Sequence, residues 1–333
     1  MDFPINVQNI KGEKNKIKKG FVKGVELADG TPVNIPLMIV TGNEPGPILA
    51  LTAGAHGTEL VGIEVIRQLF KEGIDIKKLK GTILCIPVVN PLAVQHCSYF
   101  TPQDGIDITG VMPGNPTGTI TRRIASKIWE IIVKANFMID LHSVGAPSIP
   151  FTILRPGGKP EVQKKALEMS KAVGITITQP SKETMARRPS TMVDVLMEND
   201  IPCIVIETPF EKMMREKYIK TGVIGVKNVM KFINMIDGKP EAHSGIPIIG
   251  GPYTSLMQTA TKGGIVIALK EPGEKINKGE IIANINNVFG EVVEQIISPD
   301  NGWMMGYPIA YQRNASQAVA SGDFVTFIAL ENE

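Results

Sequence analysis

The stretch LALTAGAHGTELVGIEVI, residues 49–66, decides the fold because it begins as a strand and ends as a helix. Its first half is an unbroken apolar run, as expected for a strand buried on both faces. At the junction, His56 and Glu59 lie three residues apart. In an open α/β sheet, ligands bind beyond the carboxyl ends of the strands, so both are candidates for chemistry. A structural role is the alternative, with Glu59 complementing the helix N-terminus and His56 capping the strand.

Strand-like and helix-like segments alternate from about residue 48 to 237. The strand candidates are ILALTAG, TILCIPVV, FMIDLH, PFTILR, ITITQ and CIVIET, and helices are expected near 59–72, 119–135, 161–173, 191–199 and 214–236. Gly174 is placed to end one of these helices, as a C-terminal glycine does. The alternation predicts an α/β sandwich around a parallel or mixed sheet.

From about residue 245 the pattern changes, because short strands and frequent glycines replace the helical periodicity. We therefore predict one domain over 1–240 and a smaller all-β domain, a sandwich or barrel, over 245–333. The pattern of the second domain resembles half of a biotinyl or lipoyl carrier. A carrier needs an exposed attachment lysine, and the corresponding segment SPDNGWMMG has none. We expect a structural relative without the carrier function.

Composition bounds the class of protein. The 333 residues are 43% hydrophobic and 20% charged, with a net charge of +2, which fits a globular protein of one large or two ordinary domains. Basic residues are scattered apart from KGEKNKIKKG, residues 11–20, which is expected to be a solvated loop. No nucleic-acid partner is therefore expected.

The cysteines and the N-terminus indicate the compartment. Cys85, Cys97 and Cys203 are odd in number and widely spaced, which favours free thiols in a reducing environment. The start MDFPINVQNI lacks the features of a signal peptide, and no apolar run reaches the roughly 18 residues of a membrane span. We expect a soluble, cytoplasmic protein without a membrane partner, and leave homo-oligomerisation open.

Further polar residues follow other predicted strands. His142 ends FMIDLH, where Asp140 shares its face of the strand, and Glu207 ends CIVIE. Two histidines and a carboxylate around an open position suit catalytic zinc, and a further carboxylate can serve as the base for a water molecule. Each residue alone could instead be a satisfied strand-end group. The remaining histidines, His96 and His243, are expected in loops without a partner.

The series GAHGTE, CIPVVNPLA, DGIDI, VMPG, IDLHS and CIVIETP, followed by a β-rich tail, resembles the succinylglutamate desuccinylase and aspartoacylase family. The resemblance implies a three-layer sandwich like that of the zinc carboxypeptidases, around a mixed sheet. It implies one zinc ion per chain held by His56, Glu59 and His142, with Glu207 as the general base that later hands its proton to the leaving amine. Family substrates are small N-acyl amino acids, and the likeness is strongest to deacylases with a β-rich C-terminal domain.

The chain departs from the family where Asp-Leu-Asn-Arg is usual. It reads Asp107, Ile108, Thr109 and Gly110, so the Asn-Arg pair that grips the substrate carboxylate is missing. Either the substrate lacks that carboxylate, which we slightly favour, or another arginine replaces the pair. Candidates for replacement are Arg123 and then Arg122, with Arg155, Arg187 and Arg188 on loops, although a surface role is favoured for each alone. Tyr99 or an arginine would polarise the scissile carbonyl.

The leading prediction is zinc-dependent hydrolysis of a small-molecule amide, an N-acyl amine or N-acyl amino-acid derivative. A carboxypeptidase-like peptidase is disfavoured because the carboxylate clamp is absent. A non-catalytic, metal-bound ligand-binding module is a third interpretation. Glu207 argues against it, since a binding protein needs no base there.

Overall fold

A computed structural model describes residues 3–187, 190–308 and 317–331. Its main sheet has twelve strands in the order β13-β16-β18-β11-β9-β8-β10-β7-β5-β6-β4-β3. In that order the strands are Lys275–Ile276, Gly302–Gly306, Phe324–Leu330, Tyr253–Thr259, Thr176–Pro180, Phe151–Ile153, Cys203–Phe210, Phe137–Gly145, Glu44–Ala53, Lys80–Ile86, Pro32–Thr41 and Lys16–Glu26. The sheet is mixed: β10, β7, β5 and β6 are parallel neighbours, whereas β4 and β8 pair antiparallel to β6 and β10.

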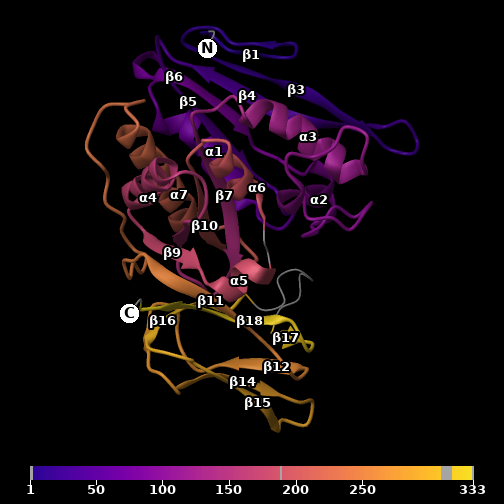
Figure 1. Cartoon of the computed structure of the whole chain (residues 1–333), viewed down its shortest axis with the longest axis vertical. Coiled ribbons are helices and arrows are strands. Elements are labelled where there is room, and N and C mark those ends of the chain that lie inside the picture. Colours follow the sequence, from indigo (N-terminus) through magenta and orange to yellow (C-terminus); the bar gives the residue numbers. More distant parts are fainter. Residues whose placement is uncertain (1–2, 188–189, 309–316, 332–333) are drawn as a thin grey trace.

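Helices connect and cover these strands. They are α1 (Val61–Gln68), α2 (Pro91–His96), α3 (Ile120–Ile132), α4 (Pro160–Val173), α5 (Lys182–Arg187), α6 (Met192–Glu198) and α7 (Glu216–Phe232). Short turns of other helix types span Leu69–Gly73, Ile76–Lys78 and Ile108–Val111. Helix α7 packs against α1 and α4, while α3 contacts β3 at the far edge of the main sheet (Figure 1). None of the described helices is long and apolar enough to cross a membrane.

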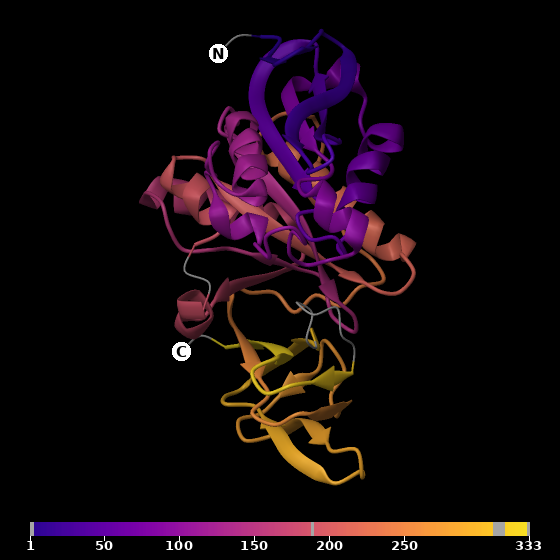
Figure 2. The same cartoon turned by 90° about the vertical axis from the view of Figure 1, so that its right-hand side faces the viewer.

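A second, smaller sheet lies at the end of the molecule opposite β1 and β3 (Figures 1 and 2). This small sheet is antiparallel, in the order β15-β14-β12-β17, with strands Val292–Ile297, Ile281–Asn286, Gly264–Ala268 and Ala318–Val319. The remaining two-stranded hairpin pairs β1 (Asn6–Val7) with β2 (Ile10–Lys11). Val266, Ile285 and Ile296 of the small sheet share a buried cluster with Met304 and Ile328 of the main sheet. The two sheets therefore pack face to face in the C-terminal region (253–331).

The predicted α/β fold with a mixed sheet is confirmed, together with a separate antiparallel β region. The six expected strands correspond to β5, β6, β7, β8, β9 and β10, and the five expected helices correspond to α1, α3, α4, α6 and α7. The division at residues 240–245 stays a prediction. Strand β11 continues the main sheet across this point, because it pairs in parallel with β9.

One loop prediction is wrong. The second half of the lysine-rich run, from Lys16 onward, forms the beginning of β3 rather than a solvated loop. Strand β3 lies at the edge of the main sheet and pairs with β4 along its length. Lysine side chains are a common feature of edge strands, where they discourage pairing with another chain. A high lysine content was therefore compatible with a strand at this position.

Candidate metal centre

The carboxyl ends of three parallel strands bring the predicted site residues together. His56 and Glu59 follow β5, His142 belongs to β7, and Glu207 belongs to β10. In the parallel register of β10 and β7, Glu207 lies directly opposite His142. The turn after His56 requires Gly57, because a Cβ atom there would come within 1.9 Å of the carbonyl oxygen of Ala93. The backbone after His56 thus lies in close contact with the backbone of Ala93.

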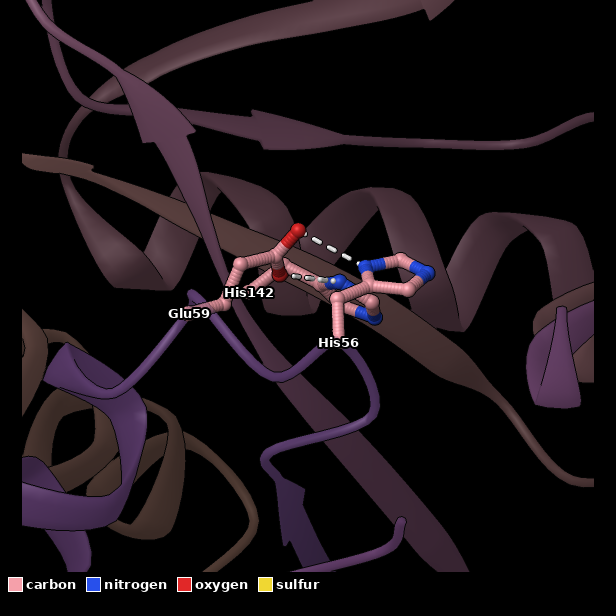
Figure 3. A group of neighbouring side chains, drawn as sticks. All are labelled: His56, Glu59 and His142. Atoms are coloured by element: carbon pink, nitrogen blue, oxygen red, sulfur yellow. Dashed lines mark hydrogen bonds and ion pairs between the residues drawn. The ribbon is translucent and has the colours of Figure 1, made fainter. Parts of the chain in front are cut away.

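Glu59 lies between the two imidazoles (Figure 3). Its Oε1 is 2.7 Å from Nδ1 of His56, and its Oε2 is 2.8 Å from Nδ1 of His142. The backbone N–H of Ser143 also donates to Oε2, at 3.1 Å. All three side chains are buried, and one potential ligand atom from each lies within 4.8 Å of the others. A single ion could therefore contact all three residues.

A second carboxylate supports each imidazole from the opposite side. Oδ1 of Asp107 is 3.3 Å from Nε2 of His56, and Oδ2 of Asp140 is 2.9 Å from Nε2 of His142. The hydroxyl of Thr52 donates to Asp140 at 2.6 Å, which fixes that carboxylate. Metal-ligating histidines usually donate their other ring N–H to such a group, which sets the tautomer. Each Nδ1 is thereby left as the atom available to an ion.

Asp107 and Asp140 were not among the predicted site residues. Asp140 carried a usable signal, because it lies two residues before His142 on the same strand and therefore on the same face. The strand pattern gave no signal for Asp107, which is 51 residues from its partner His56. Asp107 does lie in the motif DGIDI, on which the family resemblance rests. The expectation that His243 has no partner was wrong, because its Nε2 lies 2.7 Å from the carbonyl oxygen of Val173. The expectation that His96 lies in a loop was also wrong, because it is the last residue of α2.

The electrostatics follow from burial and from neighbouring charges. Burial alone would raise the pKa of Glu59, but the two adjacent imidazoles lower it well below its usual range. For His142, burial alone would lower the pKa. The carboxylates of Asp140 and Glu59 outweigh the effect of burial and raise this pKa well above its ordinary value. The pKa of His56 is also raised, despite burial, by Glu59 and Asp107. The neighbouring carboxylates thus favour the protonated form of both imidazoles.

Glu207 has the opposite environment. Burial raises its pKa to about 7, and the nearby carboxylates of Glu59 and Asp140 add to this effect while the imidazoles oppose it. A carboxyl group with such a pKa can both accept and release a proton near neutral pH. The pKa values of Glu59 and Glu207 are therefore shifted in opposite directions, although both residues belong to one centre.

The centre opens into a cavity of about 150 Å³. Its wall includes His56, Glu59, His142 and Glu207, and Tyr99, whose ring stacks on His56 with centroids 3.8 Å apart. Eleven apolar side chains form a large part of the wall: Val144, Phe151, Ile153, Pro180, Met192, Val193, Val205, Phe210, Met257, Pro308 and Phe327. Because Met257 and Phe327 come from β11 and β18, the C-terminal region contributes to the site.

The predicted substrate-binding residues are dispersed. Thr109 lines the cavity, whereas Gly110 is exposed and does not. Arg122 and Arg123 are exposed on α3 outside the cavity wall, and Nε of Arg123 donates to the carbonyl of Gly118. Arg155 does line the cavity. Of the other loop arginines, Arg187 pairs with Glu183 on the surface, and Arg188 lies outside the described residues.

A parallel-strand edge that gathers two histidines and two glutamates is typical of a metal-centred hydrolase. The chain belongs to the succinylglutamate desuccinylase and aspartoacylase family. A family model described as the succinylglutamate desuccinylase/aspartoacylase catalytic domain matches residues 45–233, more than half of the chain.

Individual relatives agree with this membership. The chain is 32% identical over 169 residues to the N-alpha-acetyl-L-2,4-diaminobutyric acid deacetylase of Halomonas elongata, covering 49% of this chain and 48% of that protein. The match thus spans about half the length of this curated relative. The fold resembles a succinylglutamate desuccinylase/aspartoacylase structure from Rhodobacter sphaeroides, with a TM-score of 0.79, 22% identity, and coverage of 95% and 96%. It also resembles the product-bound ectoine utilization protein EutE (DoeB) of Ruegeria pomeroyi, with a TM-score of 0.82, 19% identity, and 95% of each chain covered.

Proposed function

We propose that this protein is a zinc-dependent deacylase that hydrolyses a small-molecule amide, an N-acyl amine or N-acyl amino-acid derivative. The observation that carries the proposal is the bridging of two buried imidazoles by Glu59, with Asp107 and Asp140 behind them. Two nitrogens and one carboxylate form a donor set that zinc accepts in catalytic sites with an open position. Membership of a deacylase family supports the same reaction.

His56, Glu59 and His142 would hold the ion. When bound, zinc supplies a Lewis acid that acidifies water and polarises a carbonyl oxygen. Glu207 accepts the proton of the attacking water and then donates it to the nitrogen of the leaving amine. Asp107 and Asp140 hold the imidazoles in the tautomer that leaves Nδ1 without a proton. Tyr99, packed on His56, is positioned to contact the acyl group from the cavity wall.

The cavity volume supports a small substrate, and the named relative supports a chemical class for it. A volume of about 150 Å³ suits a small molecule, and engineered apolar cavities of that size accept benzene. The Halomonas elongata relative acts, by its name, on an N-acetyl amino acid. We extend this substrate class to the present chain, with the acyl group and the amine left open.

The finer structural assignments belong to the same proposal. We propose that residues 1–240 form a carboxypeptidase-like sandwich, and that residues 245–333 form a biotinyl- or lipoyl-type fold without carrier function. The contribution of Met257 and Phe327 to the cavity wall supports a role in shaping the substrate pocket. None of the three cysteines forms a disulfide bond within the described residues, which supports a cytoplasmic location.

The test is a hydrolysis screen of the zinc-loaded chain over N-acyl amino acids, neutral N-acyl amines and dipeptides. We expect metal-dependent release of a carboxylic acid from one of the first two classes. Glu207→Gln should keep zinc and lose about 10² to 10⁴ in rate, because that is what general-base assistance contributes. The matched control is Glu168→Gln, an exposed glutamate paired with Lys171 on α4.

Each outcome discriminates between the candidate functions. Unchanged turnover in Glu207→Gln would place the base elsewhere. Faster cleavage of dipeptides than of N-acyl amino acids would favour a peptidase. Stoichiometric zinc without hydrolysis of any substrate class would favour a metal-bound ligand-binding module.

A further inference from the structure

We propose that Arg155 is a specificity-determining residue that binds a carboxylate of the substrate. The substrate class is then N-acyl amino acids with a free carboxylate rather than neutral amides. This inference rests on the proposed function and adds to it the group that the enzyme recognises. It replaces the slight preference for a neutral substrate that followed from Thr109 and Gly110.

Arg155 is placed to meet a ligand in the cavity. It lies two residues after the end of β8, is 6% exposed, and lines the cavity wall. Among the described residues of that wall it is the one arginine or lysine. Arg122 and Arg123 lie outside the wall. Arg155 is therefore the wall residue whose charge can offset that of a carboxylate.

The guanidinium is held in place by a second buried residue. Nε of Arg155 donates to both carboxylate oxygens of Asp194, at 2.7 and 2.8 Å. Asp194 in turn accepts hydrogen bonds from the backbone N–H of Thr191, at 2.7 Å, and from its hydroxyl, at 2.8 Å. The bond from the backbone N–H of Thr191 is part of the capping box that begins α6. The helix start thus fixes Asp194, Asp194 orients the guanidinium, and little side-chain entropy is lost when a ligand binds.

The rest of the wall explains why a cation is needed. Besides Arg155, the ionisable wall groups are the imidazoles of His56 and His142, which already pair with carboxylates, and the acids Glu59, Asp140 and Glu207. The apolar side chains cannot compensate the charge of a substrate carboxylate, and an uncompensated buried charge is strongly unfavourable. A guanidinium can form paired, charge-assisted hydrogen bonds with a carboxylate. Arg155 therefore determines on which side of the cavity the substrate carboxylate lies.

A second polar group in the wall lacks a partner within the protein. The hydroxyl of Ser143 is buried, lines the cavity, and has no hydrogen-bond partner among the described residues. Buried polar groups in folded proteins are nearly always hydrogen-bonded. The hydroxyl is thus available to a polar group of the substrate. A pocket for a purely apolar molecule would not require such a hydroxyl.

The experiment compares matched substrates on the zinc-loaded full chain. The probes are the N-acetyl derivatives of glycine, alanine and 2,4-diaminobutyrate, each with its carboxamide, and kcat/KM is measured from acetate release. We expect the carboxylate of at least one pair to be preferred by tenfold or more. A charged hydrogen bond contributes about 1.5–3 kcal/mol, so loss of Arg155 should reduce kcat/KM for that carboxylate about 10- to 100-fold. The carboxamide should change less than about threefold.

The variants are chosen so that folding does not obscure the result. Arg155→Met alone leaves Asp194 buried without its cation, so the decisive variant is the double change Arg155→Met, Asp194→Asn. Arg155→Lys keeps the charge without the fork and should recover part of the preference. The control is Arg215→Met, an arginine whose Nε also pairs with a carboxylate but on the surface, beside Glu211. It should leave both kcat/KM values unchanged.

Several results would overturn the assignment. One is equal kcat/KM for both members of every pair, and another is a carboxylate preference that survives the double change but disappears in Arg123→Ala. If neither these probes nor any compound of the wider hydrolysis screen is hydrolysed, the proposed function fails, and calorimetry with the metal-free chain still decides on Arg155. The inference is supported if the wild-type chain binds an N-acetyl amino acid and the double variant does not. It is contradicted if the wild-type chain does not bind, or if the double variant binds equally well.

Discussion

Two regions of this molecule depart in opposite ways from the rule that charged groups are exposed and apolar groups buried. At the carboxyl ends of β5, β7 and β10, two histidines, His56 and His142, and two carboxylates, Glu59 and Asp140, are buried. The small sheet lies at the far end of the molecule (Figure 2). It exposes large apolar side chains: Ile265, Ile267, Ile281, Val292 and Ile297 are each 36–51% exposed. The first departure is compensated by partners for every charge. The second has no such compensation in the described residues.

The difference shows how to separate function from stability. Buried charge persists where a network of partners offsets its desolvation, so each member of the network depends on the others. Exposed hydrocarbon contributes little to folding, because it stays in water in both states. Substitutions should therefore have large, specific effects in the first region and small effects on the outer face of the second.

The largest expected effect comes from removing the imidazoles. In the double variant His56→Ala, His142→Ala, two of the three candidate ligands are lost, and we expect no stoichiometric zinc after dialysis and no hydrolysis. Elemental analysis of the purified chain measures the metal. The control is His96→Ala, an exposed histidine at the end of α2. Full occupancy in the double variant would refute the assignment of the centre.

The next effect is the pH dependence of stability in the metal-free chain. The pKa of Glu207 is raised to about 7 in the folded chain, so folding favours its protonated form. Its stabilising contribution is complete below the unfolded pKa near 4.5 and is lost as the pH rises through 7. Glu207→Gln lacks this dependence. Relative to wild type, the variant should gain up to about 3 kcal/mol in unfolding free energy between pH 4.5 and 8, since one pKa unit corresponds to 1.36 kcal/mol.

Denaturant titrations of both chains with a chelator present, at several pH values, measure this difference. His56 and His142 also lose stabilisation as the pH rises, because their folded pKa values are raised. They are present in both chains, so their contributions largely cancel in the comparison. A difference that stays constant from pH 4.5 to 8 would mean that Glu207 is not desolvated as described.

A smaller effect is expected from the carboxylates behind the histidines. Asp140→Asn keeps the shape of the side chain but removes the charge that orients His142, and such changes typically weaken metal binding 10- to 100-fold. Competition with a chelator of known zinc affinity measures the change. Asp237→Asn, at an exposed aspartate paired with Lys80, is the control. If the zinc affinity of Asp140→Asn were unaltered, the carboxylate behind His142 would not contribute to metal binding.

The sequence could predict the main sheet and the inner residues of the centre for one physical reason. Parallel strands end at the same edge, so polar residues at the ends of apolar runs, such as His142 and Glu207, are expected to meet. Asp107 could not be predicted from the strand pattern, because an irregular segment carries it to His56. Arg155 could not be ranked above other arginines either. Its burial depends on Asp194, 39 residues further along the chain.

The small sheet illustrates a different limit of sequence reasoning. The run GIVIA of β12 is apolar at consecutive positions and therefore predicts a strand covered on both faces. In the structure Val266 is buried at 7% exposure, while Ile265 and Ile267 on its other face are 46% and 45% exposed. Alternation within a strand cannot be recognised when both faces are apolar.

The smallest expected effect is on that outer face, and it makes the comparison sharpest. Ile267→Thr keeps the β-branched shape that suits a strand and removes hydrocarbon that is already partly in water, so the unfolding free energy should change by less than about 0.5 kcal/mol. Val266→Ala, one residue earlier on the buried face, should cost about 1–3 kcal/mol because it leaves a cavity. Denaturant unfolding of the two variants at several protein concentrations measures both. If Ile267→Thr costs as much as Val266→Ala, the outer face is covered in solution, and the two regions would no longer differ in the way described.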